Sequence, residues 1–277
     1  MTTWKLPGRA LDCDERTLVM GVLNVTPDSF SDGGRFLDHE DAVKQALRMV
    51  EDGADLVDVG GESTRPGSDP VPADEERRRV VPIVERLARE VEVPISIDTR
   101  RAEVAAAAVE AGAEIVNDVT AGRDPEMFDV VRSSGAALVL MHMKGEPKTM
   151  QEAPHYDDVV REVHDYLGER VEAAVAAGIG REAISVDPGL GFAKTTPHSL
   201  VLMKHTDALL DLGRPVLVGP SRKSFIGDVL GTEVGERAEG TVGAACYMVG
   251  KGAHVVRVHD VRETVRAVRV VDAILRA

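Results

Sequence analysis

The chain has 277 residues, of which 43% are hydrophobic, and its formal net charge is −14 at pH 7. This acidic balance disfavours nucleic acid as a partner, and apolar runs far shorter than a bilayer is thick disfavour a membrane protein. Because Met1–Arg9 lacks an apolar signal segment and the two cysteines, Cys13 and Cys246, show no disulfide or zinc spacing, we expect a cytoplasmic protein.

Short apolar runs alternate with helical stretches along the whole chain. Thr3–Leu11 predicts a short N-terminal strand or hairpin that covers the bottom of the fold. The runs that follow predict strands at Thr17–Val25, Leu56–Val59, Pro94–Ile97, Glu114–Val116, Ala136–Met141, Ile184–Val186, Pro215–Val218 and Val255–Val258. Helical periodicity predicts helices at Glu40–Asp52, Asp74–Val91, Arg101–Ala111, Met127–Ser133, Tyr156–Ala177, His198–Asp211 and Glu236–Val249, with a last helix capped by Asp260 and ending near Leu275.

This alternation of strands and helices predicts an α/β protein with a parallel sheet. Eight such units in one chain of this length are typical of a (β/α)₈ TIM barrel, here a single domain over residues 1–277. The carboxyl ends of barrel strands all open onto one face, so the residues that end the strands are expected to converge on one pocket. Those residues are Asn24, Asp58, Asp98, Asn117, His142, Asp187, Gly219 and Arg257.

Two long polar loops, Thr26–Asp38 and Gly60–Ala73, follow the first two strands. Asn24 at the end of the first strand offers an amide oxygen, a ligand type that suits Mg²⁺ shared with phosphates and water. In the second loop, Thr64 and Arg65 offer a hydroxyl and a charged fork to a phosphate. The alternative is an ordinary Gly/Pro-rich turn with a solvated arginine.

Three further strand ends, Asp98, Asn117 and Asp187, carry carboxylate or amide groups. An unpaired charge that points into a barrel interior is costly, so a polar heterocycle with several N–H donors would satisfy the set. The alternative is that each residue is a helix N-cap, which the pair Asp98-Thr99 invites.

The segment Ser221–Ser224 follows the seventh strand, and Arg257 and His259 lie on one face of the eighth. Phosphate groups in barrels favour the loops after strands seven and eight, so these residues indicate an anion clamp. A solvated turn and a satisfied buried histidine are the alternatives. Six other histidines show no metal-ligand spacing and are assigned no role: His142, His155, His164, His198, His205 and His254.

Eight segments together resemble the dihydropteroate synthase family of the folate pathway. They span nearly the whole chain in the family's order: Gly21–Gly34, Asp58–Ser68, Ile97–Thr99, Asn117–Val119, Leu140–Met143, Asp187–Lys194, Gly219–Gly227 and Val256–Val261. The resemblance implies a transferase that joins 6-hydroxymethyl-7,8-dihydropterin pyrophosphate to 4-aminobenzoate and releases pyrophosphate. It also implies Mg²⁺, an SN1-like path and a homodimer.

The resemblance carries roles over to matching positions. Asp98, Asn117, Asp187 and Lys223 resemble the pterin-binding set, beside Met141, Phe192 and Gly219 as further substrate-binding positions. Thr64, Arg65, Arg257 and His259, with Asn24 at the metal, resemble the pyrophosphate set, while Phe30, Pro66 and Ser224 match the aminobenzoate subsite that sulfonamide drugs occupy in the family. Of these, Asp98, Lys223, Arg257 and His259 are the expected catalytic residues.

The chain departs from the family's pattern at Ala193, where glycine is frequent, and in Thr120-Ala-Gly122, which replaces Ser-Gly-Gly. Neither position carries a side chain that the chemistry requires. Three other readings stay open: a non-catalytic pterin-binding paralogue, a pterin-dependent methyltransferase, and an aldolase with Lys223 as Schiff-base nucleophile.

Overall fold

The computed structural model describes residues 2–25, 35–63, 69–146 and 148–277 of the chain. Eight parallel strands follow one another around a barrel in the order β8-β7-β6-β5-β4-β3-β10-β9. A parallel bridge between Val186 and Val216 joins the two end strands and closes the ring. The strands are β3 (Leu18–Asn24), β4 (Leu56–Gly60), β5 (Ile95–Asp98), β6 (Ile115–Asp118), β7 (Ala137–Met141), β8 (Ile184–Asp187), β9 (Leu217–Val218) and β10 (Val255–Val258).

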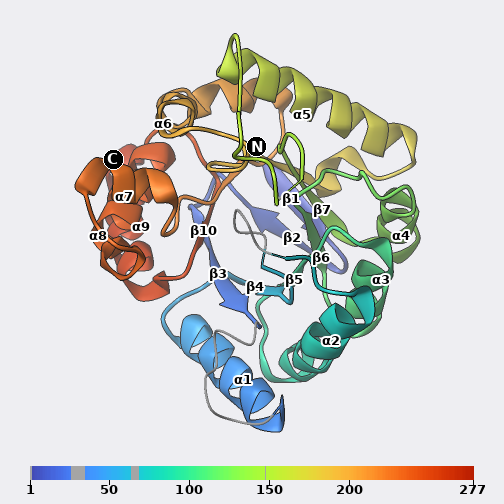
Figure 1. Ribbon diagram of the computed structural model, residues 1–277. Helices are drawn as coiled ribbons and strands as arrows, with labels where there is room; N and C mark the ends of the chain where they lie inside the picture. The colour runs from blue at the N-terminus through green and yellow to red at the C-terminus, as the bar shows by residue number, and fades with distance from the viewer. Residues whose placement is uncertain (1, 26–34, 64–68, 147) are drawn as a thin grey trace.

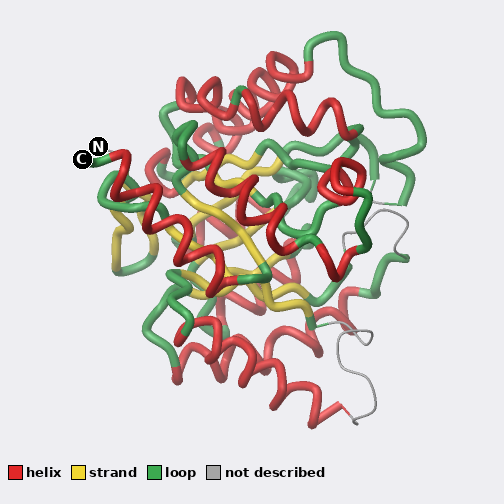
Figure 2. Tube along the Cα trace, turned by 90° about the vertical axis from the view of Figure 1, so that its left-hand side faces the viewer, coloured by secondary structure: helices red, strands yellow, loops and turns green. Residues whose placement is uncertain are grey.

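Helices surround this barrel, as expected of a TIM barrel (Figure 1). Figure 2 shows the strands in the middle of the molecule with helices on either side. The helices are α1 (Arg35–Glu51), α2 (Ala73–Glu90), α3 (Ala102–Glu110), α4 (Met127–Ser134), α5 (Val159–Ala176), α6 (Thr196–Lys204), α7 (Ser224–Leu230), α8 (Ala238–Val249) and α9 (Val261–Leu275). None of the helices in the described ranges is long and apolar enough to cross a membrane.

Side chains alternate along each strand between the helix-covered outside of the barrel and its interior. On β3, Val19 and Leu23 belong to the large core between strands and helices. Leu18 and Met20 belong instead to a separate apolar cluster with inward residues of the other strands. The lower part of the barrel interior is therefore packed with apolar side chains.

An N-terminal hairpin of β1 (Thr3–Leu6) and β2 (Arg9–Asp12) packs on that cluster, which confirms the predicted hairpin. Trp4 is fully buried there, and its Nε1 donates to the carbonyl oxygen of Ala183 at 3.0 Å. Burial of the ring removes apolar surface from water, and the hydrogen bond satisfies its one polar atom. The hairpin closes the end of the barrel opposite the strand carboxyl ends.

The helices differ from the prediction by more than two residues, or in kind, at four places. Helix α1 already begins at Arg35, and α5 begins only at Val159, because Asp158 caps it through the N–H groups of Val160 and Arg161. The helix expected at His198–Asp211 is interrupted at His205 and continues as the 3₁₀ segment Thr206–Leu212. Helix α7 was not predicted, because seven residues that include a glycine show no clear helical period.

Asp260 occupies the N-cap position of α9, but its side chain makes no capping hydrogen bond. Its carboxylate instead accepts from Nε of Arg222 at 3.1 Å. The basic pair after β9 is thus divided: Arg222 forms this ion pair at the molecular surface, while Lys223 is the N-cap residue of α7.

Candidate active site

Polar side chains gather in the upper half of the barrel, at the carboxyl ends of the strands. Three of them stand two residues beyond an apolar inward position: Asp58 follows Leu56 on β4, Asn117 follows Ile115 on β6 and Arg257 follows Val255 on β10. Asp98 and Asp187 likewise follow buried serines, Ser96 on β5 and Ser185 on β8. The two-residue period of a strand aims all five into one space.

Arg257 lies at the centre of this group. Its Nε donates to Oδ2 of Asp58 and its Nη2 donates to Oδ2 of Asp98, both at 2.6 Å. Asn117 donates through Nδ2 to the same oxygen of Asp58 at 3.0 Å. One guanidinium therefore fixes two carboxylates on different strands, and the four side chains form a connected unit.

Asp58 is fully buried and was given no role from the sequence, although it was among the expected strand ends. Its bonds to Arg257 and Asn117 make it the residue that orients both. The signal was present in the strand-end pattern itself. The partner that reveals the role lies 199 positions away in the chain, so local sequence could not show it.

The acids of this unit have unusual electrostatics. Burial raises the pKa of Asp98 to about 7, against the stabilising charge of Arg257 and with the added repulsion of Asp58. Within the described residues, Oδ1 of Asp98 and Oδ1 of Asp58 are buried without a hydrogen-bond partner. Buried acceptors left without donors are costly, so these oxygens favour a ligand that brings N–H groups.

Asp187 lies at the end of β8, where burial raises the pKa of its carboxyl group. The N–H of Gly189, at 2.7 Å from Oδ1, and the charges of Lys223 and Arg257 act in the opposite direction. The site thus places two cationic side chains, Lys223 and Arg257, beside three buried carboxylates, Asp58, Asp98 and Asp187. Such a mixture suits a polar ring with donors and acceptors on its edge.

An apolar wall borders these charges. Nζ of Lys223 lies 3.9 Å from the centre of the Phe192 ring, a cation–π contact. Phe192 and Met141 share a small cluster of buried apolar side chains. A Cβ atom at Gly219 would lie 4.0 Å from Cβ of Arg257, so this glycine lies next to the base of the Arg257 side chain. Ser224 begins α7 directly after Lys223.

On the rim, His259 joins the ends of β3 and β10. Nδ2 of Asn24 lies 3.2 Å from its Nε2, and Oγ of Ser221 lies 2.9 Å from its Nδ1. Asn24 and Ser221 therefore hold the imidazole from its two ring nitrogens. The Asn24 amide oxygen is then the group left to face a cation.

The described residues contain no group of three His, Cys, Asp or Glu side chains that could hold a metal ion alone. A site with a single amide oxygen fits Mg²⁺ only if phosphate and water supply the other ligands. The donor set therefore fits a metal that arrives with a phosphorylated substrate.

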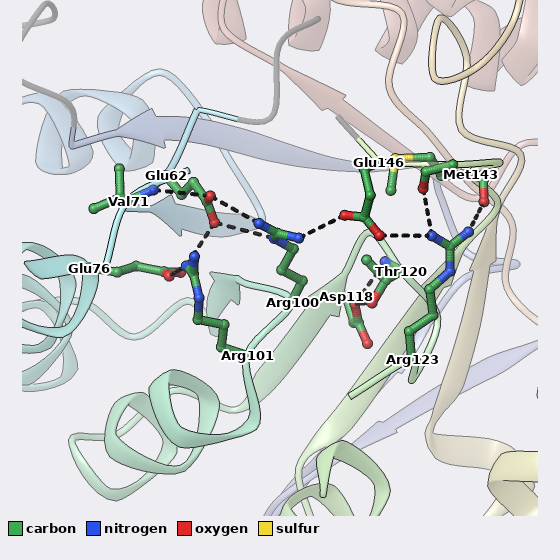
Figure 3. A network of polar contacts seen from close by, with 11 residues as sticks. Glu62, Val71, Glu76, Arg100, Arg101, Asp118, Thr120, Arg123, Met143 and Glu146 are labelled. Carbon is green, nitrogen blue, oxygen red and sulfur yellow. Dashed lines mark hydrogen bonds and ion pairs between the residues drawn. The ribbon is translucent and has the colours of Figure 1, made fainter. Parts of the chain in front are cut away.

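Four predicted residues, Phe30, Thr64, Arg65 and Pro66, lie outside the described residues. Near the start of the second loop, Glu62 forms ion pairs with both Arg100 and Arg101, and Arg100 also pairs with Glu146 (Figure 3). Arg101 also pairs with the fully buried Glu76. No local sequence pattern predicts this network, because its members lie far apart in the chain.

The comparisons with known proteins agree with one another. The model of the family described as "Pterin binding enzyme" matches residues 20–259. Dihydropteroate synthase of Escherichia coli strain K12 is 48% identical over 259 residues, which are 94% of this chain and 92% of that protein.

Solved structures show the same similarity. Yersinia pestis dihydropteroate synthase, in a sulfonamide drug complex, matches with a TM-score of 0.94 and 42% identity over 100% of both chains. Xanthomonas albilineans dihydropteroate synthase with 4-aminobenzoic acid matches with a TM-score of 0.93 and 48% identity, covering 99% of this chain and 98% of the other.

Proposed function

The chain belongs to the pterin-binding enzyme family and is a dihydropteroate synthase of folate biosynthesis, and from this premise we propose how its residues perform the reaction. The substrates are 6-hydroxymethyl-7,8-dihydropterin pyrophosphate and 4-aminobenzoate, and the products are 7,8-dihydropteroate and pyrophosphate. The observation that carries the proposal is the buried acidic pair Asp98 and Asp187, with unpartnered Oδ1 of Asp98, beside Lys223 and Arg257.

The pterin ring binds in the upper barrel. Asp98 and Asp187 accept hydrogen bonds from its ring N–H and amino groups, and Asn117 adds an amide from the next strand. Lys223 donates to the ring carbonyl. Met141, Phe192 and Gly219 flank the ring, and the apolar cluster around Phe192 supports this placement.

The reaction is a substitution at the pterin CH₂ group. The C–O bond to pyrophosphate breaks and its electron pair leaves with the oxygen, which gives a resonance-stabilised pterin cation. Ionised Asp98 stabilises this cation in a site of low dielectric, where fixed charge acts strongly. The neutral amine of 4-aminobenzoate is already nucleophilic, so no strong general base is needed. It forms the new C–N bond, and the proton that it then loses passes to water.

Pyrophosphate binds at the rim. Arg257 and His259 stabilise its charge, with Thr64 and Arg65 from the second loop. Asn24 would hold Mg²⁺ through its amide oxygen, and when bound this cation neutralises negative charge on the leaving group. Support comes from the position of Asn24 against His259, at 3.2 Å between Nδ2 and Nε2.

The second substrate, 4-aminobenzoate, binds next to the pterin CH₂ group, at Ser224 with Phe30 and Pro66. Ser224 supports this placement because it directly follows Lys223 and begins α7. We place the enzyme in the cytoplasm, which agrees with the free thiols of Cys13 and Cys246.

A homodimer forms through the face of helices α6–α9, which lie next to one another (Figure 1). Support comes from surface hydrophobicity, since within the described residues all exposed large apolar side chains fall between Leu200 and Leu275. They include Val229 and Leu230 on α7, Tyr247 on α8 and Val270 on α9. Such a concentration is typical of an interface. Val229→Glu with Val270→Glu is expected to give a monomer in sedimentation.

The direct test measures pyrophosphate release from the pterin pyrophosphate with Mg²⁺, with and without 4-aminobenzoate. Release coupled to dihydropteroate formation, and lost in Lys223→Ala, supports the reaction and the site. Arg222→Ala is the matched control, because Arg222 is the cationic residue next to Lys223 in the chain but pairs with Asp260 instead. Pterin binding without turnover would contradict the proposal and favour a non-catalytic pterin-binding protein.

A further inference from the structure

The segment 187–194, which begins at the last residue of β8, carries both Asp187 and Phe192 and packs tightly on the end of β7. Gly189 has φ of +65°, and a Cβ atom there would lie 2.0 Å from the carbonyl oxygen of His142. Only glycine permits this approach. The backbone of the segment thus lies directly against residue 142, which the sequence analysis left without a role.

Three consecutive carbonyl groups of this segment accept hydrogen bonds from three different side chains. Gln151 donates to Gly191, Lys194 donates to Phe192 at 2.9 Å, and the hydroxyl of Tyr156 donates to Ala193 at 3.0 Å. These carbonyls lie in a curved segment that has no strand or helix partner of its own. Besides one backbone hydrogen bond, from the N–H of Phe192 to the carbonyl oxygen of Gly189 at 3.1 Å, these side-chain donors hold its shape.

Lys194 is the unusual donor among the three, since the residue is only 3% exposed. Besides the carbonyl of Phe192, its Nζ lies 2.8 Å from Nδ1 of His142 and 3.3 Å from the carbonyl oxygen of His142. Two carbonyl oxygens and one ring nitrogen therefore hold the amine of Lys194 in place.

The electrostatics agree with this geometry. Burial lowers the pKa of Lys194 well below its ordinary value, although the charge of Asp187 raises it. Burial, together with the charges of Lys194 and Lys144, lowers the pKa of His142 to about 2. The imidazole of His142 is then neutral at neutral pH and can accept a hydrogen bond from Lys194 through Nδ1.

We propose that Lys194 is a positioning residue for the pterin site: it fixes the carbonyl of Phe192 against residue 142 and thereby fixes the ring on which Lys223 lies. The chain of contacts is short, because Nζ of Lys223 is 3.9 Å from the ring centre. The same segment also touches the Lys223 stem, since a Cβ atom at Gly191 would lie 3.4 Å from its Cδ. This inference rests on the proposed contact between Lys223 and the pterin.

A double-mutant cycle tests the inference, with the dissociation constant of 7,8-dihydropteroate as the readout. Lys194→Met keeps the length of the side chain and removes the donor, so the Phe192 carbonyl loses its partner, and we expect binding to weaken roughly tenfold. In a Phe192→Leu background the ring is already gone, so the same change is expected to weaken binding less than about twofold.

Tyr156→Phe is the matched control, because it removes the donor to the adjacent carbonyl of Ala193 and keeps the aromatic ring. It is expected to change binding by less than about twofold. Circular dichroism and thermal unfolding verify that each variant is folded. If Lys194→Met does not fold, Lys194→Leu, a smaller side chain that also lacks a donor, replaces it in the cycle, with the same coupling expected.

The other possible outcomes contradict either the positioning role of Lys194 or the proposed contact of Lys223. Tight binding by Lys194→Met, equal weakening by Tyr156→Phe, or an undiminished effect in the Phe192→Leu background would overturn the positioning role. Tight binding by Lys223→Ala would instead overturn the proposed pterin contact of Lys223, on which the inference rests.

Discussion

The lower and upper halves of the barrel interior are built by the same strands and bury opposite kinds of side chain. In the lower half, Leu56 and Ile115 pack with Trp4 of the hairpin in an apolar cluster. Two residues later on the same strands, Asp58 and Asn117 face the same interior and bond to each other. The strand period fixes where a side chain points, while its chemistry decides whether it stabilises the fold or serves the reaction. Stability and activity are therefore expected to separate along single strands.

The largest expected effect is on stability, from the lower half. Trp4→Ala removes a fully buried ring and its bond to Ala183, and we expect the free energy of unfolding to fall by about 4 kcal/mol. Denaturant titration measures this change, and kcat of the folded fraction should stay within about twofold. Trp4→Phe, which keeps a ring, is the milder control. A large loss of kcat in folded Trp4→Ala would show that the halves are not independent.

The upper half should respond in the opposite way. Asp98→Asn removes the charge proposed to stabilise the pterin cation, and we expect kcat to fall roughly 10²- to 10³-fold. The free energy of unfolding should not fall, because burial of an ionised Asp98 is unfavourable and Arg257 keeps its bond to Asp58. Steady-state kinetics and denaturant titration on one preparation measure both quantities.

Asp118→Asn is the matched control for that change. Asp118 is a buried acid on the same level of the barrel, but its carboxylate accepts from the backbone of its own loop at Thr120 and Gly122. Asp118→Asn should therefore lower the free energy of unfolding and change kcat only slightly. An equal loss of kcat in both variants would argue against a specific role for Asp98.

A smaller effect separates a glycine of the site from a glycine of a helix end. Gly189→Ala would place Cβ against the carbonyl oxygen of His142, so we expect at least a tenfold loss of 7,8-dihydropteroate binding. Gly135 also has positive φ, at +72°, but nothing lies within 4 Å of its Cβ position. Gly135→Ala should therefore cost only about 1 kcal/mol of stability and leave binding unchanged.

Much of the fold follows from the sequence, because each strand lies in a short apolar run that ends at, or is followed by, a polar or glycine residue. This pattern predicted the barrel and the convergence of Asp98, Asn117 and Asp187. The pattern could not reveal that Arg257 joins Asp58 to Asp98, since ion pairs between distant strands leave no local trace.

Two other features were outside the reach of sequence patterns for physical reasons. Helix α7 is too short to show a period, and its position depends on packing against α6 and α8. From the sequence, Lys194 is expected to be an ordinary surface lysine, because burial of a lysine is unfavourable and local sequence gives no sign of its partners.

Ala121 and Ala193, at the two departures from the family pattern, adopt φ of +55° and +51°, a region that favours glycine.

The most direct test of the central claim is the pH dependence of kcat/KM for the wild type and for Asp98→Asn. Burial raises the pKa of Asp98 to about 7, and only the ionised carboxylate can stabilise a cation. The wild-type rate should therefore fall about tenfold per pH unit below pH 7, and this limb should be absent from the residual activity of Asp98→Asn. A limb that persists unchanged in Asp98→Asn, or a wild-type rate that is flat down to about pH 5, would contradict the account.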